Sequence, residues 1–162
     1  MPKLIKNRAL AQDDWTCADD PAAAEAPKRV LLLAEYLQAM AAGEPAASRA
    51  VLLKPEDIDL TALQPWLAVL PLIAVHFSSS GEGRGYTQGR LLRERYGFTG
   101  ELRARGAVRV DQIWFLARCG FDAFDLAEGE DAATAIAQLD RFSVTYQPGP
   151  DGKLTHPRRR YG

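Results

Sequence analysis

Glycines, serines and arginines crowd one loop of the sequence, and their chemistry suits the binding of an anion. Residues 78–87 read SSSGEGRGYT and follow the strand-like run LIAVHF at 72–77. Glycine lets a backbone approach a ligand closely, and the N–H groups that open a following helix attract negative charge. Arg84 could add a paired guanidinium contact to a phosphate, sulfate or carboxylate. The candidate ligand-binding residues of this loop are Gly83, Arg84, Gly85 and Tyr86.

The glycine spacing differs from the known nucleotide-binding fingerprints. GEGRG at 81–85 has the form GxGxG. A dinucleotide-binding loop has the form GxGxxG, which would require its third glycine at position 86, where this chain has Tyr86. No GK[ST] sequence follows, so the loop is not a Walker loop. A glycine-rich turn that binds no ligand is the alternative interpretation.

Arginine is unusually frequent after this loop. Between residues 84 and 118 the chain has eight arginines and no lysine. This preference suits paired recognition of oxyanions or carboxylates, because guanidinium is planar and presents a fork of donors. Arg105 ends a predicted strand and therefore joins the candidate ligand-binding residues. Ion pairs on helix surfaces, such as Arg90 with Glu94, are the alternative for the others.

Carboxylates near the ends of predicted strands and helices complete the candidate site. Asp111 and Gln112 open a predicted helix, where Asp111 could act as a general base and Gln112 could contact the ligand. The helix dipole alone also explains an acid at that position. Asp125 and Glu128 lie near the end of another predicted strand, which is a favourable place for a site. His76 is interpreted as a packing residue, and two histidines without a cysteine cluster predict no metal site.

The pattern of apolar residues predicts alternating strands and helices of the α/β class. Helix-length connections between strands favour parallel pairing. We therefore expect a three-layer, mostly parallel open sheet of about four to five strands with helical crossovers. A closed eightfold barrel would need roughly 200 residues or more. The predicted strands are 49–53, 72–77, 101–105, 121–126 and 142–147, and the predicted helices are 33–40, 60–70, 87–96, 108–118 and 132–139. Residues 3–16 could also form an N-terminal strand or loose hairpin.

Length and composition are those of an ordinary globular protein. The 162 residues are 47% hydrophobic and 25% charged, with a net charge of −1. These values predict a single α/β domain over 1–162, with a loose N-terminal segment at 1–28 and a flexible basic tail at 148–162. Near-zero net charge gives no pull toward nucleic acid or membrane. Two distant cysteines and the lack of a signal-like or membrane-length apolar run predict a cytoplasmic protein.

The stretch GRGYTQGRLLRERYGFTGELRARGAVRVDQIWFLARCGFDAF resembles a bacterial family of unknown function, domain of unknown function number 934. The motifs that carry the resemblance are GRGY, ELRARG, the DQ pair and RCGFDAF, and it covers most of residues 50–126. Its members are often described as oxidoreductases and are encoded beside genes for assimilatory sulfite reduction. This chain departs from the family pattern FxDGRG, since it reads FSSSGEGRG, and it has Ala107 where an acidic residue is frequent.

The resemblance and the residues together predict an accessory or anion-binding protein linked to assimilatory sulfite reduction. Its expected partners are an enzyme of sulfite reduction and an anionic small molecule. One alternative is an oxidoreductase that holds a phosphate-bearing cofactor in the glycine-rich loop, although the sequence identifies no cofactor. Another is a structural interaction protein, a homodimer whose arginines only form ion pairs.

Overall fold

Within the part of the chain that the structure describes, the strands form a single mixed sheet of eight, in the order β2-β1-β8-β7-β6-β5-β4-β3. The computed structural model describes residues 3–141. Strands β3 to β8 run parallel, whereas β1 pairs antiparallel with both β8 and β2. The strands are β1 (Lys3–Lys6), β2 (Ala9–Ala11), β3 (Thr16–Cys17), β4 (Arg29–Leu32), β5 (Arg49–Leu53), β6 (Leu72–Phe77), β7 (Glu101–Gly106) and β8 (Ala123–Leu126).

The expectation of about four to five strands in a mostly parallel sheet is therefore corrected to eight strands in a mixed one. Of the four further strands, β1 and β2 form a hairpin within residues 3–16, where the sequence allows a strand or loose hairpin, whereas β3 and β4 were not predicted. Each of the four has only two to four residues. Segments this short show no usable alternation of apolar and polar residues. The strand predicted at 142–147 and the tail at 148–162 lie outside the described residues.

Helices follow most of the strands. The α-helices are α1 (Leu33–Ala41), α2 (Arg84–Arg90), α3 (Ile113–Arg118) and α4 (Ala132–Leu139). A π-helical turn, η4 (Leu91–Arg95), continues α2, and 3-10 turns occur at η1 (Pro21–Glu25), η2 (Ala46–Ser48), η3 (Thr61–Trp66) and η5 (Val110–Gln112). The helix predicted over 60–70 is the 3-10 turn η3, since Pro65 has no N–H to donate. No helix within residues 3–141 has the length and apolar character needed to cross a membrane.

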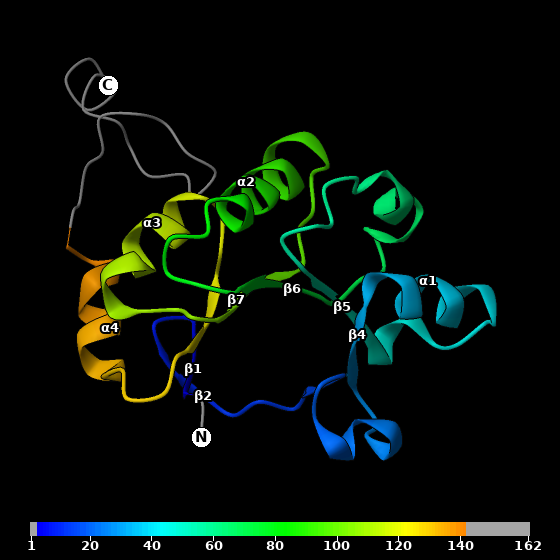
Figure 1. Cartoon of the computed structure of the whole chain (residues 1–162), viewed down its shortest axis with the longest axis horizontal. Coiled ribbons are helices and arrows are strands. Elements are labelled where there is room, and N and C mark those ends of the chain that lie inside the picture. The colour runs from blue at the N-terminus through cyan, green and yellow to red at the C-terminus, as the bar shows by residue number, and fades with distance from the viewer. Residues whose placement is uncertain (1–2, 142–162) are drawn as a thin grey trace.

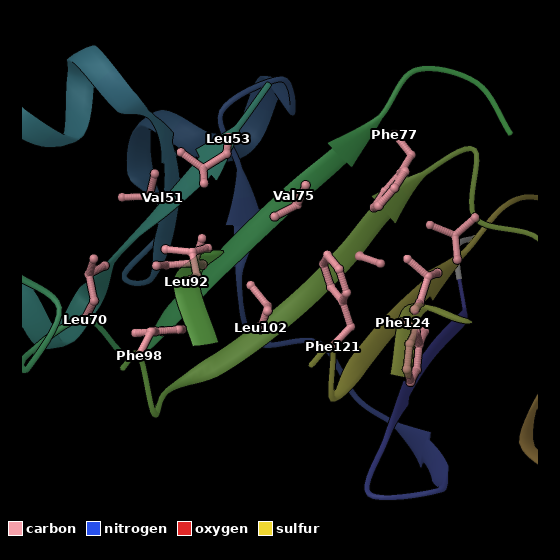
Figure 2. Close-up of a cluster of buried hydrophobic side chains, with 14 of the residues drawn as sticks. Val51, Leu53, Leu70, Val75, Phe77, Leu92, Phe98, Leu102, Phe121 and Phe124 are labelled. Carbon is pink, nitrogen blue, oxygen red and sulfur yellow. The ribbon is translucent and has the colours of Figure 1, made fainter. Parts of the chain in front are cut away.

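The α-helices pack on one face of the sheet (Figure 1). A continuous core joins Tyr36 of α1, Leu116 of α3 and Ala135 of α4 to side chains on β5, β6 and β7. Figure 2 shows part of this core, including Val51, Val75, Leu102 and Phe124. The expected three layers are thus not formed. Strands β3 to β8 are neighbours in sequence order, so right-handed crossovers place each helix on the same side.

The sheet is curled, and its opposite edges are tied by a short connection. Strands β2 and β3 form the two edges, yet only residues 12–15 join them. Seven strand spacings in a flat sheet would span about 34 Å. The five residue steps from Ala11 to Thr16 can reach about 18 Å at most. The sheet must therefore curl, and the connection runs along its concave side, as the blue segment of Figure 1 shows.

The concave face is divided into an apolar part and a charged part. Val30, Ala50, Leu72 and Ala74 form a small apolar cluster over β4 to β6. Arg103 and Asp125 are buried on β7 and β8, where side chains of the opposite parity face the helices. Residues 12–20 lie against this face, because Asp13 pairs with Arg103 and Asp19 pairs with Arg105.

Candidate functional site

The carboxyl ends of β4 to β8 surround a hollow on the concave side of the sheet. Parallel strands present their carboxyl ends at one edge, where ligands of α/β proteins collect. The hollow has two adjoining parts of about 270 and 330 Å³ that share Asp19 and His76. Its charged lining consists of Asp19, Glu35, Lys54, Arg105, Asp125 and Glu128, with His76 between the two parts.

Arg105 provides a guanidinium on the wall of this hollow. Its Nη2 lies 3.4 Å from Asp19 Oδ1, and its Nε lies 3.7 Å from Asp125 Oδ2. Charge-assisted hydrogen bonds between such groups are shorter, about 2.7–2.9 Å. The side chain is 23% exposed, so the acids hold Arg105 in place without occupying its donors closely. A bound anion could accept hydrogen bonds from it.

Arg103 lies on the same face two residues earlier and has a different environment. Its side chain is only 4% exposed and lies 2.8 Å from both Asp13 Oδ2 and Glu101 Oε1. Glu101 also pairs with Lys6 of β1. These close contacts occupy the guanidinium, so Arg103 fastens the N-terminal segment to β7, whereas Arg105 is available to a ligand.

Asp125 supplies a buried carboxylate beside Arg105. The residue is 6% exposed, and burial raises the pKa of its carboxyl above the ordinary value, although the Arg105 and Arg103 charges oppose this shift. Within residues 3–141, no N–H or O–H group donates a hydrogen bond to it, and its ion pair with Arg105 is 3.7 Å long. Buried polar groups normally have such partners. Asp125 therefore has acceptor capacity that a ligand could fill.

His76 completes the wall from the neighbouring strand. It pairs in register with Arg105 and is half-buried. Gly106 makes room for its ring, because a Cβ at Gly106 would lie 3.0 Å from His76 Nδ1 and 2.4 Å from the Phe77 carbonyl oxygen. Gly106 also has a φ of +99°, which side chains strongly disfavour. The glycine at this strand end is thus required by both conformation and space.

The residues of the glycine-rich loop lie apart from this hollow. Gly83 and Arg84 are exposed at the start of α2. Gly85 faces the core, where an added Cβ would lie 2.6 Å from the Phe77 ring. The Tyr86 ring packs edge-to-face on Phe77 with 5.3 Å between centroids. Close packing of α2 on β6 accounts for Gly85 without a ligand.

Gln112 links the glycine-rich loop to the start of α3. Its Nε2 donates to the Ser80 carbonyl at 2.7 Å, and its Oε1 accepts from the Arg109 N–H at 3.0 Å. Burial raises the pKa of the Tyr86 phenol, and the neighbouring Gln112 side chain partly opposes this rise. Asp111 is exposed, with Oδ1 3.8 Å from Arg109 Nε.

The structure therefore divides the candidate residues between the two faces of the sheet. Tyr86 and Gln112 meet on the helical side, and Asp111 lies near them, whereas Arg105 faces the concave side. Among residues not selected as ligand contacts, His76, Lys54 and Asp19 line the hollow around Arg105. The alternation in ELRARG could have revealed the charged face, because residues two apart on a strand share a side.

A larger hollow of about 550 Å³ lies at the opposite edge, near the amino ends of β7 and β8. Arg93 on its wall donates to the carbonyl oxygens of Phe98, Gly100 and Gly120 at 2.7–2.9 Å. Its Nη2 also lies 3.3 Å from Asp122 Oδ2. These contacts give Arg93 a structural role, so the hollow around Arg105 is the better candidate despite its smaller size.

Comparison with known protein families identifies the family of this chain. Residues 50–156 match the family model of a bacterial protein of unknown function, DUF934. The chain belongs to this family. The matched region contains Lys54, His76, Arg105 and Asp125, whereas Asp19 precedes it. The chain matches no curated protein.

Proposed function

We propose that this DUF934 protein binds an anionic small molecule at the carboxyl ends of its parallel strands, as an accessory component of assimilatory sulfite reduction. The observation that carries the proposal is Arg105, whose guanidinium borders the hollow and forms, among the described residues, only long ion pairs of 3.4 and 3.7 Å. The link to sulfite reduction rests on the resemblance of the GRGY, ELRARG and RCGFDAF motifs to the family.

Two neighbours support an anion next to Arg105. Lys54 follows β5 and lines the adjoining part of the hollow, so it adds a positive charge on the same edge. His76 lies between Arg105 and Lys54 and could donate a hydrogen bond or, when protonated, add a further charge. An anion entering this hollow would replace the exposed Asp19 carboxylate as the partner of Arg105.

The test is isothermal titration with sulfate, sulfite and phosphate, and a thermal-shift screen with nucleotides, flavins and nicotinamides. Arg105→Gln should weaken anion binding at least tenfold, because a charge-assisted hydrogen bond contributes about 1.5–3 kcal/mol. Arg90→Gln is the matched control, since Arg90 is exposed on α2 and pairs with Glu94. The anion affinity of Arg90→Gln should stay within twofold of that of the unmodified protein.

Arg84→Gln separates this proposal from the glycine-rich-loop hypothesis. If Arg84→Gln loses anion binding and Arg105→Gln retains it, the ligand lies at the loop and the proposal is wrong. Stabilisation by a flavin or nicotinamide that depends on Arg84 would favour the oxidoreductase alternative. Capture of a sulfite-reducing enzyme from a lysate by the tagged full-length chain would support the accessory role.

A further inference from the structure

The charges around the hollow favour a ligand that carries a positive group beside its negative group. Four carboxylates line its two parts, from Asp19, Glu35, Asp125 and Glu128, against the two permanent cations of Arg105 and Lys54. With His76 neutral, the lining therefore carries a formal charge of −2, from two positive and four negative groups. A simple anion would gain from Arg105 but would be repelled by this excess of acid.

Asp125 differs from the other three acids. Asp19, Glu35 and Glu128 are exposed, so water hydrates them, whereas Asp125 is 6% exposed. A buried carboxylate is costly unless donors or a cation satisfy it. Arg105 approaches it at 3.7 Å, and no group within the described residues donates a hydrogen bond to it. Among residues 3–141 the carboxylate therefore has no hydrogen-bond donor, at a point where it borders an open hollow.

Arg105 and Asp125 lie side by side on neighbouring strands. β7 and β8 pair in register through Ala104 and Phe124, so the residues that follow them are adjacent on the concave face. Both side chains line the same part of the hollow. A ligand with one anionic and one cationic group could satisfy both at once, because each group would meet an opposite charge.

We infer that the hollow binds a zwitterion of amino-acid type, whose anionic group is held by Arg105 and whose ammonium group is held by Asp125. This inference rests on the proposed function and specifies the class of ligand. Discrimination follows from the same geometry. A ligand without the ammonium group leaves Asp125 buried without donors, and a ligand without the anionic group leaves Arg105 with its long pairs.

The test compares matched probes that differ in one charge. Titrations of the full-length protein use the common α-amino acids and taurine. Each amino acid is compared with its N-acetyl derivative, and taurine with isethionate, in which a hydroxyl replaces the ammonium group. At least one zwitterion should bind at least tenfold more tightly than the matched probe that lacks the ammonium group. Arg105→Gln should abolish binding of both members of that pair.

Asp125→Asn should reduce the ratio of the two affinities to near one, with its folding checked by urea unfolding. Asp14→Asn is the matched control, because Asp14 is exposed beside Lys28 and does not line the hollow. This substitution removes the same charge as Asp125→Asn. That variant should keep the ratio. The comparison of probes on the unmodified protein needs no variant, so it tests the inference even if Asp125→Asn fails to fold.

The outcomes separate this inference from the proposed function. If sulfate or isethionate binds through Arg105 and no zwitterion binds better than its partner, the inference is wrong and the anion site stands. A ratio that is unchanged in Asp125→Asn would also overturn it. Absence of binding by every probe would overturn both.

Discussion

Tyr36 shows how one buried hydroxyl can make stability depend on pH. The residue is fully buried, and its Oη has no hydrogen-bond partner among residues 3–141. Burial raises the pKa of Tyr36 from 10.0 to about 12, so folding favours the neutral phenol. The contribution of this raised pKa to the free energy of unfolding is complete below pH 10 and is lost as the pH rises from about 10 through 12.

Tyr36→Phe should remove this dependence. Relative to the variant, the unmodified protein should lose about 1.4 kcal/mol of unfolding free energy between pH 8 and pH 11. At pH 8 the variant should be about 1 kcal/mol more stable, because an unpaired buried hydroxyl is removed and the ring is kept. Urea unfolding at both pH values measures these differences. A variant clearly less stable at pH 8 would mean that the hydroxyl has a stabilising partner.

Single residues of the site were partly predictable. Arg105 was identifiable because it ends a predicted strand, at the turn that leads to the next predicted helix. Its surroundings were not, since the period of two shows that Arg103 and Arg105 share a face but not which face the helices cover. Asp19 and Asp125 reach Arg105 from segments 86 and 20 residues away, and no local pattern encodes such pairing.

At the scale of elements, the glycines of α2 determine how closely this helix packs on β6. An added Cβ would lie 2.6 Å from the Phe77 ring at Gly85 and 2.4 Å from the Phe121 ring at Gly89. We predict that Gly89→Ala lowers the unfolding free energy by about 1–3 kcal/mol, because overpacking a buried interface forces neighbours to move. Chemical denaturation of the variant measures the change.

Gly81→Ala is the control for this prediction. No atom lies within 4 Å of an added Cβ there, and Gly81 is not among the glycines with positive φ. Its stability should change by less than about 0.5 kcal/mol, as for other surface substitutions. Equal costs at Gly81 and Gly89 would contradict the packing explanation and would point to a general effect of losing glycine.

The elements themselves followed the sequence where apolar periodicity was strong. The strand predicted at 72–77 and the helix predicted at 132–139 coincide with β6 and α4. The start of α2 was placed three residues too late, at 87 instead of Arg84, because glycine has low helix propensity. Tertiary packing overrides that propensity here, since Gly85 and Gly89 permit the close contact with β6 and Phe121.

At the scale of the whole molecule, the layer arrangement could not be inferred from periodicity. The sequence indicates which residues alternate, but the order of strands decides whether crossovers cover one face or two. Here the strand order never reverses between β3 and β8, so the α-helices all cover one face of the sheet. The other, concave face is left to the N-terminal segment. That segment then brings Asp19 to the ligand hollow.

Arg103 fastens this segment to the sheet, so its loss should destabilise the whole fold. Its guanidinium is 4% exposed and joins Asp13 of the connection to Glu101 of β7. Arg103→Met keeps much of the volume but leaves two carboxylates without their shared cation. We predict a loss of about 3–5 kcal/mol in urea unfolding, the usual cost of breaking a buried pair. Arg90→Met should cost no more than about 0.5 kcal/mol, because its pair with Glu94 is exposed.

The double variant Arg103→Met, Asp13→Asn identifies the contribution of the connection. If the contact with Asp13 matters, the second change should cost less in the Arg103→Met background than alone, because the carboxylate has already lost its partner. Strictly additive costs would mean that Arg103 acts through Glu101 alone and that residues 12–15 are held by chain geometry. Coupling would instead show that one buried guanidinium fastens the connection between the two edge strands to β7, on the same face that presents Arg105 to the ligand.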